Sequence, residues 1–209
     1  MTLPSAASEL ALLEAAAREA GALVRELIRK PLETVSKRDG SPVTDVDLAV
    51  NALLAERLQS ARPDYGWLSE ETPDDPVERM GKSRVFVLDP IDGTTALIRK
   101  LPEFTISIGI VEHGRAFVGA IYNPMTDEMF LGAPGHGATL NERPIRASQR
   151  EELADAHVFA PKNRIASWQG RPPWPGMDIS HRRSIAYRLA AVAAAHADAA
   201  LLFGFKHEW

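Results

Sequence analysis

Hydrophobic positions recur with helical spacing in two segments near the start of the chain. Over residues 5–29, apolar residues recur at steps of three and four between Glu and Arg, which predicts an amphipathic helix that Pro31 ends. A second helix is predicted to begin at Thr44 or Asp45, because either residue can cap a helix N-terminus. Its expected buried stripe consists of Ala49, Leu53, Leu54 and Leu58. The intervening residues 35–42 are polar and rich in turn formers, so a flexible loop is expected there.

Apolar runs and alternation predict strands farther along the chain. Residues 65–69 are expected to form a short strand that ends at Glu70 and Glu71, and residues 84–88 form a second, strongly apolar run that ends at Asp89. Residues 104–141 alternate between apolar and small residues and are interrupted by turns, which predicts an antiparallel meander.

The C-terminal third returns to a mixed pattern. Residues 156–160 and 199–203 are predicted strands, and the Ala-rich stretch 184–196 is a predicted helix. The mixture of helices and antiparallel strands favours a layered α/β or mixed α+β architecture. We expect an N-terminal α+β lobe over residues 1–145, which carries the candidate site, and a partial C-terminal α/β lobe over residues 146–209.

Composition narrows the class of protein. The 209 residues are 45% hydrophobic and 25% charged, which is ordinary for a soluble globular protein. The net charge of −4 gives no sign of a surface for nucleic-acid polymers, which is normally basic. The chain has no cysteine, which excludes disulfides, thiolate metal sites and cysteine nucleophiles. No secretory signal or membrane span is recognisable, so no membrane partner and a cytoplasmic location are expected.

Three acidic clusters lie at the ends of predicted elements: Asp45 with Asp47, Glu70 with Glu71, and Asp89 with Asp92. Any one cluster alone is explained by helix capping or by solvation of a strand end. Residues 89–94 are more informative, because they place two carboxylates and a Gly between a buried strand and a predicted helix. Carboxylate and carbonyl oxygens suit Mg²⁺, and amides at a helix N-terminus suit a phosphate group.

Residues 89–94, Asp-Pro-Ile-Asp-Gly-Thr, resemble the signature of the inositol monophosphatase superfamily, whose members are metal-dependent, lithium-sensitive phosphatases. Residues 41–47, Ser-Pro-Val-Thr-Asp-Val-Asp, resemble the upstream acidic element of that superfamily, and residues 68–72, Leu-Ser-Glu-Glu-Thr, resemble its paired-Glu element. Three motifs in the right order make the resemblance specific, and it extends over essentially the whole chain. It implies an α-β-α-β-α sandwich, a homodimer, and hydrolysis of small phosphate monoesters.

The resemblance also implies roles for individual residues. Glu70, Asp89 and the backbone carbonyl of Ile91 would ligate one Mg²⁺, and Asp89 with Asp92 would hold a second. The implied catalytic residues are Asp47, Thr94 and Glu70; the first two would activate the attacking water. The expected substrate-binding residues are Gly93, Thr94, Ser184 and Lys37. Lys37 resembles a residue that closes over the site, although a solvated loop lysine explains it equally well. The six histidines have no ligand spacing, so surface or core roles are expected.

Members of the superfamily place a further metal-binding Asp directly after a Trp, whereas this sequence ends at Trp209. The second metal would then lack a carboxylate. Either the chain is cut short relative to the natural protein, which we favour, or it is a truncated and inactive relative. We expect the 209 residues alone to be a poor catalyst.

The substrate is less well determined than the chemistry. Many inositol phosphatases carry an acidic residue six positions before that Trp, where Phe203 stands here. A Phe cannot accept hydrogen bonds from sugar hydroxyls, which favours 3′-phosphoadenosine 5′-phosphate over inositol monophosphate. A non-catalytic regulatory or interaction protein that reuses the fold is the alternative.

Overall fold

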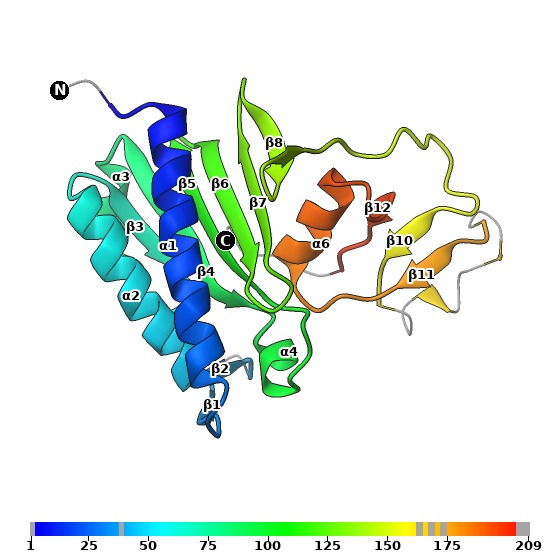
Figure 1. Cartoon of the computed structure of the whole chain (residues 1–209), viewed down its shortest axis with the longest axis horizontal. Coiled ribbons are helices and arrows are strands. Elements are labelled where there is room, and N and C mark those ends of the chain that lie inside the picture. Colours follow the sequence, from blue (N-terminus) through cyan, green and yellow to red (C-terminus); the bar gives the residue numbers. More distant parts are fainter. Residues whose placement is uncertain (1–2, 38–39, 162–164, 167–169, 172–174, 204–209) are drawn as a thin grey trace.

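The computed structural model describes residues 3–37, 40–161, 165–166, 170–171 and 175–203. The chain forms successive layers of helix, sheet, helix and sheet, in the order of the expected sandwich (Figure 1). Helices α1 (Ala6–Leu27) and α2 (Asp45–Ala61) cover one face of the large sheet. Helix α6 (Ile185–Ala193) lies between this sheet and the smaller sheet of β10 and β11. The mixed α/β class predicted from the sequence is confirmed.

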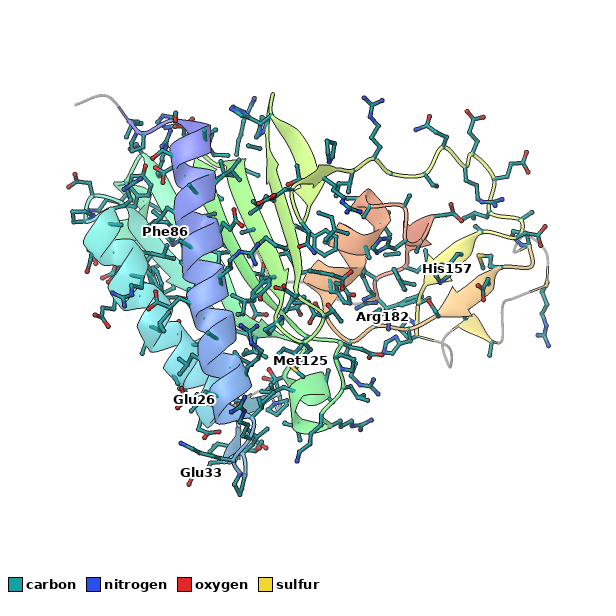
Figure 2. The ribbon with its side chains drawn as sticks, viewed as in Figure 1. Glu26, Glu33, Phe86, Met125, His157 and Arg182 are labelled. Carbon is teal, nitrogen blue, oxygen red and sulfur yellow. The ribbon has the colours of Figure 1, made fainter. Side chains whose placement is uncertain are left out.

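Helices α1 and α2 form where the periodicity predicts them. Ser5 caps α1 by accepting a hydrogen bond from the Ser8 amide, and Thr44 caps α2. The predicted stripe of α2 was partly wrong: Val46, Asp47, Val50, Leu54 and Leu58 are buried, whereas Ala49 and Leu53 are half-buried. The stripe begins nearer the helix start because Asp47 turns inward toward the site. Phe86 is fully buried where α1 and α2 cover the sheet (Figure 2).

The segment expected to be a flexible loop contains a small hairpin instead. Strands β1 (Thr34–Ser36) and β2 (Pro42–Thr44) pair antiparallel, with Val35 opposite Val43. β-branched residues at the two ends of the polar stretch form the pairs, and the turn residues lie between them. Glu33 precedes the hairpin and lies at the lower end of the molecule in Figure 2.

The large sheet has seven strands in chain order, β3-β4-β5-β6-β7-β8-β9. Strands β3 and β4 are parallel, and the following neighbours are antiparallel, which confirms the predicted meander. The strands are β3 (Gly66–Ser69), β4 (Arg84–Asp92), β5 (Thr105–Glu112), β6 (Arg115–Asn123), β7 (Glu128–Ala133), β8 (Gly137–Leu140) and β9 (Arg143–Pro144). Short helices α3 (Pro76–Met80) and α4 (Thr94–Ile98) lie in the connections on either side of β4. Strand β4 extends to Asp92, beyond its predicted end at residue 88.

The C-terminal third forms a parallel sheet in the order β11-β10-β12. Its strands are β10 (His157–Phe159), β11 (Asp178–Ser180) and β12 (Ala199–Ala200). The predicted strand 199–203 is therefore shorter than expected. Helix α6 joins the two sheets: Tyr187 packs on Phe130 of β7, and Ala191 packs with Phe159 of β10. Among the described helices, none combines the length and apolar character needed to span a membrane.

Candidate active site

The ends of β3 and β4 place two predicted ligands side by side. The strands run parallel, with Ser69 opposite Leu88, so the residues that follow, Glu70 and Asp89, lie side by side where β3 ends and β4 continues to Asp92. The Glu70 amide donates to the Leu88 carbonyl at 3.1 Å, which holds the two strand ends together. Parallel pairing thus brings together carboxylates that lie 19 positions apart in the sequence.

An irregularity in β4 brings Asp92 to the same side as Asp89. Residues three apart in a regular strand point to opposite faces. Here Asp89 lies opposite Ser107 and Asp92 opposite Thr105, so β4 has one more residue than β5 over this stretch. The extra residue is a bulge, which reorients the side chains that follow it. Both carboxylates therefore line one cavity.

Gly93 makes the turn from β4 into α4. Its φ of 100° and ψ of 38° lie in the left-handed region, which favours Gly. A Cβ atom at this position would lie 3.1 Å from the Glu103 carbonyl oxygen and 3.2 Å from the Ser184 amide. Gly93 therefore permits a close crossing of three backbone segments beside the carboxylates.

Asp47 and Thr94 form the pair that the sequence predicts. Thr94 Oγ1 lies 3.0 Å from Asp47 Oδ1, to which it donates. The other oxygen of Asp47 accepts from the Thr44 amide at 2.9 Å and from the Thr44 hydroxyl. Burial raises the pKa of Asp47, and the hydrogen bonds from Thr44 oppose that shift. The start of α2 therefore holds the Asp47 carboxylate in a fixed orientation toward Thr94.

Ser184 lies beneath Asp92. Its hydroxyl donates to Asp92 Oδ2 at 2.6 Å, and the Ala186 amide donates to the same oxygen at 2.5 Å. The Ser184 hydroxyl also caps α6 by accepting from the Tyr187 amide. Ser184 is 0% exposed, so its hydroxyl presents no surface to a substrate. Ser184 therefore supports Asp92, and its predicted contact with a substrate stays a prediction.

Lys37 reaches from the β1–β2 hairpin to the end of β3. Its Nζ lies 2.7 Å from Glu70 Oε1 and 2.6 Å from Glu71 Oε1. Burial alone would lower the pKa of Lys37, but its hydrogen bonds to the two carboxylates raise it. Burial raises the pKa of Glu71, and the Lys37 ammonium opposes that shift. Of the two interpretations of Lys37, the structure favours a position at the site over a solvated one.

A cavity of about 360 Å³ brings together most of the predicted residues, although Asp47, Lys37 and Ser184 are not part of its wall. It is lined by Ser41, Pro42, Glu70, Asp89, Ile91, Asp92, Gly93, Thr94, Thr95, His181 and Arg183. A larger cavity of about 460 Å³ between the sheet and α6 has almost entirely apolar walls and contains none of the predicted site residues. The smaller, polar cavity is therefore the candidate active site.

The charge of this cavity fits a hard cation. Burial, together with the negative charges of Asp92 and Glu70, raises the pKa of Asp89 well above its usual range. Three carboxylates and the Ile91 carbonyl are the oxygen ligands that Mg²⁺ prefers. Within the described residues, no three acidic or histidine side chains converge closely enough to enclose an ion. All three carboxylates are engaged by protein donors: Glu70 by Lys37, Asp89 by the Ile91 amide, and Asp92 by Ser184 and Ala186.

His181 and Arg183, which are not among the residues predicted for the site, reach the cavity from distant positions in the sequence. His181, expected to have a surface or core role, lines the wall, where burial and the nearby Arg188 and Arg183 lower its pKa. Arg183 lies beside it and pairs with Glu103 at 3.0 Å. No local spacing links these residues to the carboxylates, so the sequence carried no signal for them. The expectation of a missing ligand at Trp209 concerns a residue outside the described ones.

Comparison with known proteins gives a consistent result. A model described as "Inositol monophosphatase family" matches residues 6–209. The Nus factor SuhB of Xylella fastidiosa is 33% identical over 202 residues, which cover 91% of this chain and 72% of that protein. The 3'(2'),5'-bisphosphate nucleotidase CysQ of Escherichia coli is 36% identical over 121 residues, or 57% of this chain and 49% of that protein.

Solved structures agree on the fold. The extragenic suppressor protein suhB of Bartonella henselae matches with a TM-score of 0.79 and 26% identity, over 91% of this chain and 76% of that one. The inositol monophosphatase of Anabaena matches with a TM-score of 0.68 and 29% identity, over 91% of this chain and 71% of that one. The described architecture is therefore similar to that of both proteins.

Proposed function

Since the chain belongs to the inositol monophosphatase family, we propose that it is a Mg²⁺-dependent phosphatase that hydrolyses a small phosphate monoester. The observation that carries the proposal is the cavity where Glu70, Asp89 and Asp92 meet the Asp47–Thr94 pair. These residues come from separate parts of the chain. Their gathering around one cavity is difficult to explain by helix capping or by solvation of strand ends.

The proposed ligands are those of the sequence prediction. Glu70, Asp89 and the Ile91 carbonyl would hold one Mg²⁺, and Asp89 with Asp92 a second, while Li⁺ would inhibit. Bound Mg²⁺ supplies the chemistry that lowers the pKa of a water and stabilises the charge of the leaving oxygen. The Ser184 hydroxyl and the Ala186 amide orient Asp92 for this role.

Asp47 and Thr94 would accept the proton of the attacking water. Because Thr94 Oγ1 donates to Asp47 Oδ1, its lone pairs are free to accept a hydrogen bond from a water. The proton can then pass through the Thr94 hydroxyl to Asp47, which acts as general base. The amides of Gly93 and Thr94 border the cavity and would bind the phosphate oxygens.

The substrate of this proposal is a small phosphate ester rather than a nucleic-acid polymer. We favour 3′-phosphoadenosine 5′-phosphate, which is consistent with the name of the CysQ relative, over inositol monophosphate. Phe203, which replaces an acidic residue of many inositol phosphatases, supports the same preference for the nucleotide over inositol monophosphate. A homodimer and a cytoplasmic location remain predictions from the sequence.

The test is release of inorganic phosphate by the protein at its natural length, assayed on both substrates with and without Mg²⁺ and Li⁺. We expect Mg²⁺-dependent turnover, which Asp89→Asn abolishes. The buried Asp89 lies among like charges, so the neutral amide should not lower the free energy of unfolding. Asp64→Asn, at an exposed carboxylate, is the matched control and should keep full activity. A protein that releases no phosphate under any condition contradicts the proposal.

A regulatory role is the second candidate. It is favoured by the printed name "Nus factor" of relatives such as the Xylella fastidiosa protein, whose match covers 91% of this chain. A protein that acts only by binding a partner should tolerate Asp89→Asn, which leaves the surface unchanged. Loss of the cellular phenotype in that variant would therefore support the enzyme, and retention would support the regulatory role.

A further inference from the structure

The site contains a positively charged side chain, Lys37, next to two of its carboxylates. The Lys37 ammonium bridges Glu70 and Glu71 at 2.7 and 2.6 Å. The Lys37 side chain is 22% exposed and that of Glu71 is 7% exposed, so the contact is largely shielded from water. Glu70 also lines the carboxylate cavity. A single ammonium group thus stands against a carboxylate that the proposed metal would use.

Hydrogen bonds to helix α2 hold the turn that carries Glu70 and Glu71. The Ser69 hydroxyl donates to Asn51 Oδ1 at 2.7 Å, and the Asn51 amide donates to the Thr72 hydroxyl at 3.0 Å. These bonds attach the turn that carries Glu70 and Glu71 to helix α2. Glu70 and Glu71 therefore stay close together in the fold, and a nearby positive charge stabilises their two carboxylates.

The segment that carries Lys37 is more weakly attached. Within the part of the chain that the structure describes, strand β1 pairs with β2 alone, and all three of its residues are exposed. Segments with few buried contacts open at the lowest free-energy cost. When Glu70 changes partner, β1 and the Lys37 side chain are therefore the parts that move, while the end of β3 and β2, whose Thr44 caps α2, stay in place.

We propose that Lys37 is a tethered counter-ion, whose ammonium neutralises Glu70 and Glu71 in the metal-free protein and leaves Glu70 when Mg²⁺ binds. The inference rests on the metal-dependent function proposed above. A divalent ion attracts a carboxylate more strongly than a monovalent ammonium at the same distance, so Mg²⁺ can compete with Lys37 for Glu70. Breaking the Lys37 contact costs part of the binding free energy, so the wild-type protein binds Mg²⁺ more weakly than its carboxylates alone would.

Calorimetric titration of Mg²⁺ into metal-free protein tests the exchange. Lys37→Gln removes the competing charge, and we expect about tenfold tighter binding, as for loss of a partly shielded ion pair. Lys37→Arg keeps the charge and should bind within about twofold of the wild type. Lys30→Gln changes the net charge equally at an exposed position near the end of α1 and should bind as the wild type does.

A second measurement follows Lys37 itself in the wild type. Acetylation by a small reagent, quantified by mass spectrometry, should be faster at Lys37 when Mg²⁺ is present, whereas the rate at Lys30 should not change. Unchanged or slower acetylation of Lys37 would overturn the exchange. Equal or weaker Mg²⁺ binding by Lys37→Gln, with normal binding by the wild type, would overturn it as well. If neither protein binds Mg²⁺, the proposed metal dependence itself fails, and the inference fails with it.

Discussion

Gly93 shows how a single residue fixes the geometry of the site. Its left-handed backbone lies against the Glu103 carbonyl and the Ser184 amide, which are hydrogen-bonded to each other at 3.1 Å. A methyl group here would strain the turn and push these segments apart. Because Ser184 also supports Asp92, the disturbance would reach the candidate ligands.

We therefore predict that Gly93→Ala lowers the free energy of unfolding by about 2 kcal/mol, measured by urea denaturation. Gly81→Ala is the control, because Gly81 has a φ of −78° and a Cβ atom there would have the Glu78 carbonyl oxygen, at 3.7 Å, as its nearest neighbour. That substitution should be neutral or slightly stabilising. Equal stability of the two variants would show that the backbone at Gly93 has room for a methyl group beside Glu103 and Ser184.

The sequence predicted individual site residues best where a local motif contained them. Asp89, Asp92 and Thr94 lie within six consecutive residues, so their proximity needs no knowledge of the fold. The burial of Ser184 could not be predicted, because it depends on where α6 meets β4. Likewise, the position of His181 on the cavity wall depends on a contact between segments about 90 positions apart.

Helix α6 is fastened to β7 by one aromatic side chain. The Tyr187 hydroxyl donates to Glu128 Oε2 at 2.5 Å, and its ring packs edge-on against Phe130. Burial, followed by the hydrogen bond and charge of Glu128, raises the pKa of Tyr187 to about 12, although Arg182 opposes the shift. The folded protein therefore holds this hydroxyl in its neutral form at a pH where the unfolded chain loses the proton.

Because folding raises the pKa of Tyr187, this group stabilises the folded protein fully below about pH 10, the pKa of tyrosine in the unfolded chain. The stabilisation declines as the pH rises toward 12. We predict that Tyr187→Phe is less stable than the wild type by about 1 kcal/mol near neutral pH, because one buried hydrogen bond is lost. Above about pH 10 this difference should shrink, since only the wild type loses stability from Tyr187. Urea denaturation of both proteins across this range checks it; a constant difference would contradict the assigned pKa.

Elements whose hydrophobic residues repeat regularly over many positions were predicted correctly. Elements that depend on which strands pair with each other were not. The amphipathic pattern of α1 and the alternation of β5 to β7 are repeated over many residues. The hairpin of β1 and β2 has only three residues in each strand, and its turn residues suggested a loop. Strand β4 continues past Pro90 because a bulge accommodates the missing amide, and sequence periodicity does not reveal a bulge.

The proposed division at residues 145 and 146 raises the question of whether the two parts of the molecule are independent. Residues 145–156 connect β9 to β10 without regular secondary structure (Figure 1). The site nevertheless crosses the division, because Asp92 is held by Ser184 and Ala186. Tyr187 and Ala190 form a buried apolar cluster with Phe130 of the other part. We therefore interpret the parts as lobes of one folding unit.

This interpretation predicts that cutting the connection does not separate the lobes. A sequence-specific protease site inserted between the exposed Arg146 and Ala147 allows one clean cut. We expect the two fragments to elute together in size-exclusion chromatography, as the uncut insertion variant does. They should also stay together at high salt, because buried contacts are screened much less than partly exposed ion pairs such as Arg182–Glu103. Separation at low salt would mean independent domains, whereas separation only at high salt would mean that exposed charges, rather than the Tyr187 cluster and the Asp92 hydrogen bonds, join the lobes.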